Sequence, residues 1–315
     1  MKFLARSALI PLVALATIGN RAWAQTASPT PVTQCGQVLD QPGEYILTGA
    51  LDRQECPNDS CSAAGGAITI SASNVHLDTA GHGVTAICAA LVITDGVSDV
   101  RIDGGGWLFG GSGLIIGQDT KIVVSGLADI RGDADLGSTE TGIELDGASK
   151  VTVSNNKIEG VFGIHGQVDR GVFVNNQIYG INIVNYGIVL TGQDNVISND
   201  TVTLSGLSAD NTAISVTDRS RILSNTVHQA AVGISLAGDS NKVNGNTVDG
   251  ASPPSVAIAS VYGIYVSQGA AGNTIKRNKA AGNEYDVYDH NGPPCVNTWR
   301  KDRYQTSGGA VACIH

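Results

Sequence analysis

Acidic and basic side chains that could exchange protons with a substrate occur in two short segments of this 315-residue chain. Glu144 and Asp146 alternate with apolar residues in the first segment, and His165, Asp169 and Arg170 lie in the second. Two carboxyl groups about 5–9 Å apart can act as acid and base on a glycosidic bond. We therefore pair Glu144 with Asp146 or Asp169, with His165 as a proton donor. A lyase would need a base instead, and His165 or Arg170 could supply it.

Five further side chains are predicted to contact a bound ligand. They are Gln167, Thr191, Thr217, Tyr262 and Tyr265. Amide and hydroxyl groups can hydrogen-bond to a sugar, and tyrosine rings present an apolar face with a polar tip. Two insertions, 126–141 and 249–262, precede the segments that carry several of these residues. Loops on a rigid scaffold often carry binding chemistry, so these two are expected to flank the ligand.

These side chains can meet only if a repeated element holds them in register. One phrase recurs nine times: Gly or Ala, an apolar residue, a variable residue, and a second apolar residue. Its apolar pairs are Ile68/Ile70, Leu91/Ile93, Leu114/Ile116, Ile143/Leu145, Ile164/Gly166, Ile188/Leu190, Ile214/Val216, Ile234/Leu236 and Ile264/Val266. Apolar residues at every second position indicate strands with one buried face, and no helical period competes with them.

A second phrase, built around asparagine, follows the later copies of the first. Its members are Asn156, Asn225, Asn246 and Asn278, and Asn176 and Asn199 fit the same register. Asparagine tolerates the left-handed backbone conformation of a sharp bend, and stacked asparagines can hydrogen-bond along a ladder. We expect such a bend between two strands of each repeat.

Together the two phrases predict an all-β chain folded as a right-handed parallel β-helix of about nine or ten coils. A hairpin sandwich would need Asn-Gly or Asp-Gly turns every 8 to 12 residues or so, out of phase with these repeats. Stacked parallel coils bury their apolar residues and pair their backbones with neighbouring coils. Adjacent strands are about 4.8 Å apart, so Glu144, Asp146, His165 and Gln167 should form one polar patch on the outer wall.

The ends of the solenoid are expected to carry disulfide-bearing caps. An even number of cysteines in an exported protein indicates disulfides, and the candidates are Cys35, Cys56, Cys61, Cys88, Cys295 and Cys313. Proximity favours Cys295 with Cys313 and leaves the pairing of the other four open. We divide the chain into a signal peptide (1–24), an N-terminal cap with the first coil (25–66), the β-helix (67–288) and a C-terminal cap (289–315), where Trp299 should plug the core.

The first residues have the layout of a secretory signal. Lys2 and Arg6 precede an apolar run, and Ala22-Trp23-Ala24 forms the expected cleavage site, so we predict a secreted or periplasmic protein. The run is shorter than the roughly 20 residues of a membrane span, and no stable membrane insertion is expected after cleavage. The formal net charge of −9 would become −12 without Lys2, Arg6 and Arg21. Such a charge disfavours nucleic acid, and also anionic glycans unless a cation or local basic group intervenes.

Two segments resemble small exported right-handed β-helix repeat proteins with the pectate-lyase-like fold. The opening runs through Cys35-Gly-Gln-Val-Leu-Asp-Gln-Pro-Gly-Glu-Tyr-Ile-Leu and Ser73-Asn-Val-His-Leu-Asp-Thr-Ala-Gly-His, and the close is Asp289-His-Asn-Gly-Pro-Pro-Cys-Val-Asn-Thr-Trp299 with Cys313. The likeness covers nearly all of 35–315 and implies the fold. Function stays open, because this scaffold serves lyases, hydrolases, epimerases, adhesins and the periplasmic accessory proteins of nitrous oxide reductase.

No metal site or cofactor is predicted. His76 and His82 lack a second ligand pair with zinc spacing and are expected to be structural. The only methionine is Met1, so a thioether copper site is not expected, which weakens an analogy with copper-handling accessory proteins. Calcium at Asp133, Asp135, Glu144 and Asp146 has suitable oxygen ligands but no dedicated loop motif.

The leading functional hypothesis is a protein that recognises a polysaccharide on its strand face and could process it as a lyase or hydrolase. The first alternative is a non-catalytic envelope, surface or adhesive rod, in which the acids are ordinary solvated positions. The second alternative is a periplasmic accessory protein. The adjacent aspartates of polygalacturonase-like enzymes and the Asp-Pro-His-Asp motif of alginate epimerases do not occur in the chain.

Overall fold

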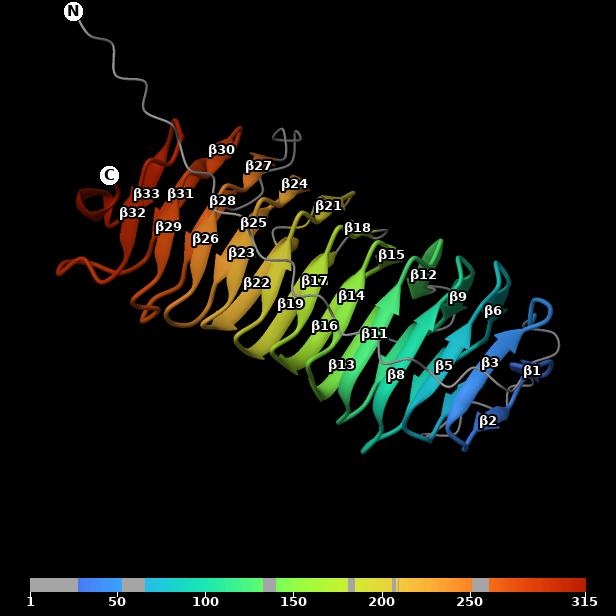
Figure 1. The fold of residues 1–315 in the computed structure, drawn as a ribbon. Helices are drawn as coiled ribbons and strands as arrows, with labels where there is room; N and C mark the ends of the chain where they lie inside the picture. Colours follow the sequence, from blue (N-terminus) through green and yellow to red (C-terminus); the bar gives the residue numbers. More distant parts are fainter. Residues whose placement is uncertain are drawn as a thin grey trace, which may run out of the picture.

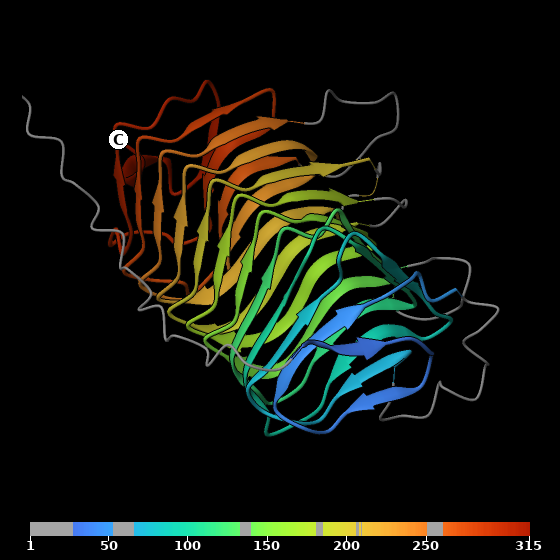
Figure 2. The same cartoon turned by 45° about the vertical axis from the view of Figure 1, so that its right-hand side comes forward.

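The strands of this protein stack into one long solenoid. The computed structural model describes residues 28–52, 66–132, 140–180, 185–205, 208, 210–250 and 261–315. Its strands pair in parallel, each with the corresponding strand of the next coil. Figure 1 shows β1 and β2 at one end and β32 and β33 at the other, and Figure 2 shows the coils stacked along one axis. The predicted right-handed parallel β-helix is confirmed.

Most coils contribute one strand to each of three faces. Face 1 carries the repeated Gly-apolar phrase and consists of β2 (Gln37–Leu39), β4 (Ile68–Ile70), β7 (Ala89–Ile93), β10 (Ser112–Ile116), β13 (Thr141–Ser149), β16 (Phe162–Asp169), β19 (Tyr186–Gln193), β22 (Thr212–Asp218), β25 (Val232–Leu236), β28 (Tyr262–Val266), β31 (Tyr285–Asp289) and β33 (Ser307–Gly309).

Face 2 follows face 1 in each coil. It consists of β1 (Thr30–Val32), β3 (Gly43–Leu47), β5 (Val75–Asp78), β8 (Ser98–Asp103), β11 (Thr120–Ser125), β14 (Thr152–Ser154), β17 (Val172–Val174), β20 (Val196–Ser198), β23 (Arg221–Leu223), β26 (Lys242–Asn244), β29 (Thr274–Lys276) and β32 (Thr298–Arg300). Thr120 pairs with Ser149 at the bend, which joins faces 1 and 2 into one continuous sheet.

Face 3 closes the coil and is a separate sheet. It consists of β6 (Gly83–Thr85), β9 (Trp107–Gly110), β12 (Asp129–Gly132), β15 (Lys157–Gly160), β18 (Gln177–Gly180), β21 (Thr201–Leu204), β24 (Thr226–Ala230), β27 (Thr247–Gly250) and β30 (Lys279–Ala281). A short 3-10 helix, Val311–Cys313, lies near the C-terminus. No helix in the described ranges has the length and apolar character that crossing a membrane requires.

The predicted inward residues form continuous columns inside the solenoid. On face 1 the first apolar residue of each phrase pairs with that of the next coil, as Ile143 does with Ile164 and Ile164 with Ile188. These side chains are fully buried. Burial of one such side chain contributes roughly 1.5–3 kcal/mol, so the stacked columns are the main stabilising feature of the fold.

The Gly or Ala that precedes each apolar pair on face 1 is small because the backbone of the next coil lies very close to it. A Cβ on Gly163 would lie 2.7 Å from the carbonyl oxygen of Gly187. Gly166, predicted as an inward residue, departs from the column. It has φ +134°, it is half-buried, and a Cβ there would lie 1.9 Å from the Leu145 carbonyl oxygen, so backbone replaces a side chain at this place.

The asparagine phrase forms the predicted ladder at the bend between faces 2 and 3. Asn225 Nδ2 donates to Asn246 Oδ1 at 3.0 Å, and Asn246 Nδ2 donates to Asn278 Oδ1 at 2.9 Å. The left-handed conformation belongs to the residue before each rung, such as Asn199 with φ 56°. The prediction that Asn199 belongs to the ladder is therefore wrong. The buried Asp200 occupies that position of the ladder instead.

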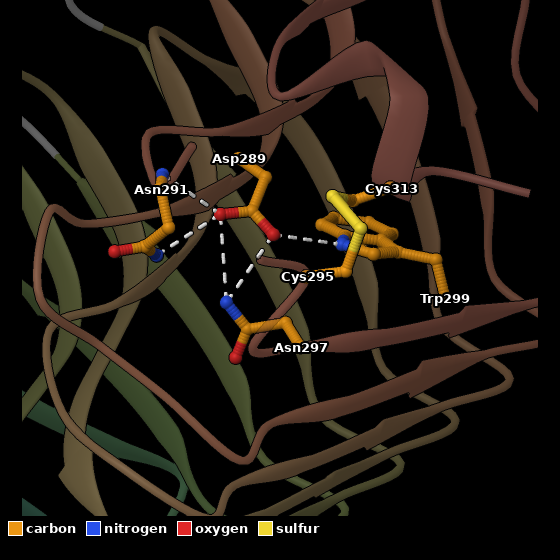
Figure 3. Close-up of a disulfide and its surroundings, with 6 residues drawn as sticks. All are labelled: Asp289, Asn291, Cys295, Asn297, Trp299 and Cys313. Atoms are coloured by element: carbon orange, nitrogen blue, oxygen red, sulfur yellow. Dashed lines mark hydrogen bonds between the residues drawn. A yellow bond between two sulfur atoms is a disulfide. The ribbon is translucent and has the colours of Figure 1, made fainter. Parts of the chain in front are cut away.

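The C-terminal cap closes the core as expected. Cys295 and Cys313 form the predicted disulfide, and Trp299 pairs with Ile275 and is 2% exposed. Figure 3 shows the buried Asp289 beside them, accepting hydrogen bonds from Trp299 Nε1 at 3.1 Å and Asn297 Nδ2 at 3.2 Å. At the other end, Cys35 and Cys88 each take part in a disulfide, and Cys56 and Cys61 lie outside the described residues.

Candidate functional site

The predicted polar patch forms on face 1, because alternation turns every second side chain outward. Glu144 pairs in register with His165, and Asp146 pairs with Gln167. Ser112 Oγ donates to Glu144 Oε2 at 3.2 Å, which fixes the carboxylate against the preceding coil. Glu144 and His165 are half-buried, whereas Asp146 and Gln167 are exposed.

His165 belongs to an aromatic group that crosses two coils. Its ring packs on Phe162 with centroids 4.5 Å apart, and Phe162 stacks on Tyr186 at 4.8 Å with an interplanar angle of 7°. We call Phe162, His165 and Tyr186 the first aromatic cluster. It places a broad apolar surface directly beside the Glu144 carboxylate.

Asp169 and Arg170 lie away from this patch. They follow His165 by four and five residues, so Asp169 is roughly 13 Å further along an extended strand. Asp169 Oδ1 accepts a hydrogen bond from Gln193 N at 2.9 Å, and Arg170 adopts φ 58° in the turn toward face 2. The structure thus brings Glu144, Asp146 and His165 together and does not bring Asp169 or Arg170 to them.

The two predicted threonines bind the scaffold with their hydroxyl groups. Thr191 Oγ1 donates to the Gly166 carbonyl oxygen at 3.4 Å, and Thr217 Oγ1 donates to the Gly192 carbonyl oxygen at 2.6 Å. Thr191 is exposed and Thr217 is half-buried, so their methyl groups and oxygen lone pairs are what they can offer a ligand.

Tyr262 and Tyr265 belong to a second aromatic cluster, together with Tyr285, Tyr288 and His290. Tyr262 pairs with Tyr285 and Tyr265 with Tyr288, and the stacked ring centroids are 5.8 and 5.7 Å apart. Tyr265 Oη lies 3.1 Å from His290 Nδ1. Burial and the neighbouring Tyr262 and Tyr288 raise the pKa of Tyr265, which keeps its hydroxyl protonated.

The sequence prediction missed Tyr285, Tyr288 and His290. The tenth copy of the phrase has Asp286 in place of Gly or Ala, so the search for the phrase ended at Tyr262-Gly-Ile-Tyr265. The spacing Tyr-x-apolar-Tyr is shared by both segments, and that repeated pair of tyrosines was the signal that could have revealed the cluster.

Small side chains separate the two clusters. Between β19 and β28, the outward side chains of face 1 that align with the two clusters are Thr212 and Ser215 of β22 and Val232 and Ser235 of β25. We call these four the saddle. The distance from β19 to β28 is three strand spacings, about 14 Å.

Face 3 carries a group of paired charges that the sequence prediction also missed. Arg131 bridges Asp129, at 3.1 Å, and Glu159, and Lys157 bridges the same two carboxylates. We call these four residues the ion-pair quartet. Arg131 was expected in an insertion flanking the ligand, but the segment 126–132 contains strand β12 of face 3. Residues 133–139 and 251–260 of the two insertions lie outside the described residues.

Within the ion-pair quartet, the two cations Arg131 and Lys157 balance the charges of Asp129 and Glu159. Burial and then Glu159 raise the pKa of Asp129, and Lys157 and Arg131 act against both effects. The hydrogen bond to Glu159 is the main cause of the raised pKa of Lys157. Arg131 lies over the Phe109 ring at 5.1 Å and Lys157 over Tyr179 at 5.8 Å. Because each carboxylate already holds two cations, the quartet stabilises the wall and offers no free acid or base.

A family model described as "Periplasmic copper-binding protein (NosD)" matches residues 99–312, well over half of the chain. The chain belongs to the NosD family. This match and the solenoid confirm the predicted resemblance to small right-handed β-helix repeat proteins. No match was found among curated proteins.

Two solved structures are similar to this NosD-family chain. It is similar to an alginate lyase from Paenibacillus sp. str. FPU-7, with 14% identity, a TM-score of 0.54, and coverage of 85% of this chain and 96% of the lyase. It is also similar to a DFA-IIIase from Arthrobacter chlorophenolicus A6 without its lid, with 12% identity, a TM-score of 0.46, and coverage of 85% and 87%. At 14% identity, the likeness to the alginate lyase shows the fold alone.

Among the described residues of this NosD-family chain, the donor groups do not fit a copper site. Soft ligands such as cysteine and methionine select Cu(I), but the described cysteines are all in disulfides and the only methionine is Met1. No group of three or more His, Cys, Asp or Glu residues in the described ranges could hold a metal ion. His76, for example, hydrogen-bonds Glu44 and Asp103 with its two ring nitrogens. Asp133 and Asp135 of the calcium alternative lie outside the described residues.

Proposed function

We propose that this NosD-family protein resides in the periplasm and binds a neutral polysaccharide that lies along face 1, across the strands. The observation that carries the proposal is the pair of aromatic clusters on one face, with the saddle between them. The strand register aligns Tyr186 with Tyr262 through Thr212 and Val232, so both clusters offer ring surface at the same height of the wall. A sugar chain can stack on both clusters and hydrogen-bond to the saddle hydroxyls.

The charge of face 1 favours a neutral chain. The ligand's path from the first aromatic cluster to the second passes Thr212, Ser215, Val232 and Ser235, none of which is ionisable. The only carboxylates among the candidate residues of the patch, Glu144 and Asp146, would repel an anionic polymer, as would the net charge of −9. The shallow wall suits an extended chain better than a small ligand, which needs to be enclosed.

Within this proposal, proton transfer belongs to Glu144 and His165. They pair in register, and His165 belongs to the first aromatic cluster, where a bound sugar would end. Assays for reducing ends and for unsaturated products test this step. A product formed by the wild type and lost in Glu144→Gln supports it. A wild type that binds but releases no product excludes the step and leaves the binding proposal standing.

Titration calorimetry with neutral and uronic-acid oligosaccharides tests the binding. Removing stacking surface in Tyr262→Ala with Tyr288→Ala should weaken binding about tenfold, equivalent to roughly 1.4 kcal/mol. Tyr179→Ala on face 3 is the matched control and should bind like the wild type. Circular dichroism and thermal melting establish that both variants fold. No binding to any polymer, or equal loss in the control, would support a non-catalytic rod.

A further inference from the structure

Six exposed cationic side chains gather where faces 2 and 3 meet in two adjacent C-terminal coils. Their members are Lys276, Arg277, Lys279, Arg300, Lys301 and Arg303, which we call the basic corner. Cross-strand pairing aligns Lys276 with Arg300 and Lys279 with Arg303. Arg277 N donates to the Arg300 carbonyl oxygen, which aligns the bends of the two coils as well. Figure 1 shows β29 and β32 side by side at this end.

The basic corner has no carboxylate partners in the described part of the chain. None of the ion pairs between described residues involves its six cations, whereas Arg101, Lys121, Arg131, Lys157 and Arg219 are all paired. The nearby acids are occupied. Asp302 accepts hydrogen bonds from Asn278 Nδ2 and Arg300 N, and Asp249 lies 3.4 Å from His228.

This arrangement concentrates positive charge on an acidic protein. Like charges placed directly opposite each other on neighbouring strands are destabilising. A chain with 19 cationic and 28 acidic residues has acids enough to neutralise the corner, yet none of the described acids forms an ion pair with its six side chains. A dense anionic partner would relieve the repulsion and bind through the combined field of the six groups.

The shape of the basic corner indicates which kind of anionic partner it can bind. Arg277 and Lys301 adopt left-handed conformations, φ 56° and 59°, at the sharp bend, so the cations fan out from a convex edge. None of the residues of the two bends themselves, 276–279 and 300–303, is aromatic, and the neighbouring Trp299 is buried, so the corner offers no ring on which a sugar could stack. A convex edge cannot enclose a small ion, but it can rest on a flat anionic surface.

We propose that the basic corner docks this protein onto an anionic lipid surface through headgroup phosphates. The corner joins faces 2 and 3, so it is the edge of the solenoid opposite face 1. Docking therefore leaves face 1 directed away from the membrane and open to its ligand. The contact is peripheral and electrostatic, and it is independent of whether face 1 binds a polysaccharide.

Co-sedimentation of the full chain with vesicles tests the proposal. Vesicles of phosphatidylcholine with 30% or so phosphatidylglycerol should bind the protein at about 50 mM salt and release it at about 500 mM, because salt screens surface charge. Pure phosphatidylcholine should not bind it. Neutralising two cations in Arg277→Asn with Lys301→Asn should weaken partitioning by about 30-fold.

The matched control is Lys121→Asn with Lys150→Asn. These residues are also exposed lysines with left-handed backbones, φ 59° and 56°, and the charge change is the same. Asparagine tolerates that conformation, so both variants should fold. Binding that the control loses equally, binding to soluble polygalacturonate but not to vesicles, or no binding at all would each overturn the proposal.

Discussion

Asp200 Oδ1 accepts a hydrogen bond from Asn176 Nδ2 at 2.9 Å, which places a carboxyl group in the middle of the asparagine ladder. At an ordinary rung Nδ2 donates to the next coil, as Asn225 does to Asn246. Asp200 has a carboxyl oxygen, Oδ2, in place of that Nδ2 donor. This oxygen is buried without a partner among the described residues. Burial raises the pKa of Asp200 to about 6, although the hydrogen bonds from Asn176 act in the opposite direction.

Replacing Asp200 by asparagine should stabilise the protein at neutral and alkaline pH. Between the ordinary pKa of 3.8 and the raised value of about 6, the folded state keeps a proton that the unfolded state has lost. Stability therefore falls as pH rises through this range, by up to about 3 kcal/mol. Asp200→Asn should recover roughly 1–3 kcal/mol at pH 8 and flatten the dependence. Thermal melts at about pH 5 and pH 8 measure both effects.

The reciprocal change provides the control. Asn225→Asp moves the carboxyl group one rung along the same ladder and should lower the melting temperature more at pH 8 than at pH 5. The explanation would be wrong if Asp200→Asn were less stable than the wild type at pH 8.

His76 joins three coils of face 2 through its two ring nitrogens. Nδ1 lies 2.5 Å from Glu44 Oε2 and Nε2 lies 2.9 Å from Asp103 Oδ1. Both contacts are hydrogen bonds only when the ring is protonated. Burial opposes that charge, but the hydrogen bonds to Asp103 and Glu44 outweigh it and raise the pKa of His76.

We therefore expect His76→Gln to lower the melting temperature more at about pH 5.5 than at about pH 9. A raised histidine pKa gives stability that is complete below the ordinary value of 6.5 and is lost as pH rises through the folded value. Arg101, 2.5 Å from Asp103, and the neighbouring Asp78 also face this group. His82→Gln is the control, and an equal loss at both pH values would contradict the account.

The C-terminal cap depends on the buried carboxylate of Asp289. Figure 3 shows its oxygens facing Trp299, Asn297 and Asn291 beside the disulfide. Asp289→Leu would leave these donors unsatisfied, which costs about 1–3 kcal/mol for each buried group. Urea denaturation should show that loss, while Glu284→Gln, at an exposed site, should be neutral. An unchanged midpoint in Asp289→Leu would show that the cap does not rely on this carboxylate.

The architecture could be predicted because it follows from local periodicity. Ile143 and Leu145 repeat in phase with later pairs, and a parallel stack then places Glu144 beside His165 without further information. The Asp200 rung was missed because Asn199, its neighbour, fits the asparagine pattern equally well in sequence. Only the backbone shows that Asn199 adopts the left-handed conformation and that Asp200 points into the ladder.

The ion-pair quartet and the basic corner were missed for a different reason. Asp129 and Lys157 are 28 residues apart, and their contact depends on which positions of face 3 point outward. Lys276 lies opposite Arg300 only because β29 and β32 pair in this register on face 2. Pairing of charges across coils is a property of register, and the length of each intervening turn must be known before it can be derived.

The central claim is that a polysaccharide lies on face 1 between the two aromatic clusters. A crystal structure of the protein soaked with mixed neutral oligosaccharides tests it most directly. We predict sugar density that begins at Tyr186, crosses Ser215 and Ser235, and ends on Tyr262. Density on face 2 or face 3, or a face 1 that stays empty at saturating oligosaccharide, would contradict the account.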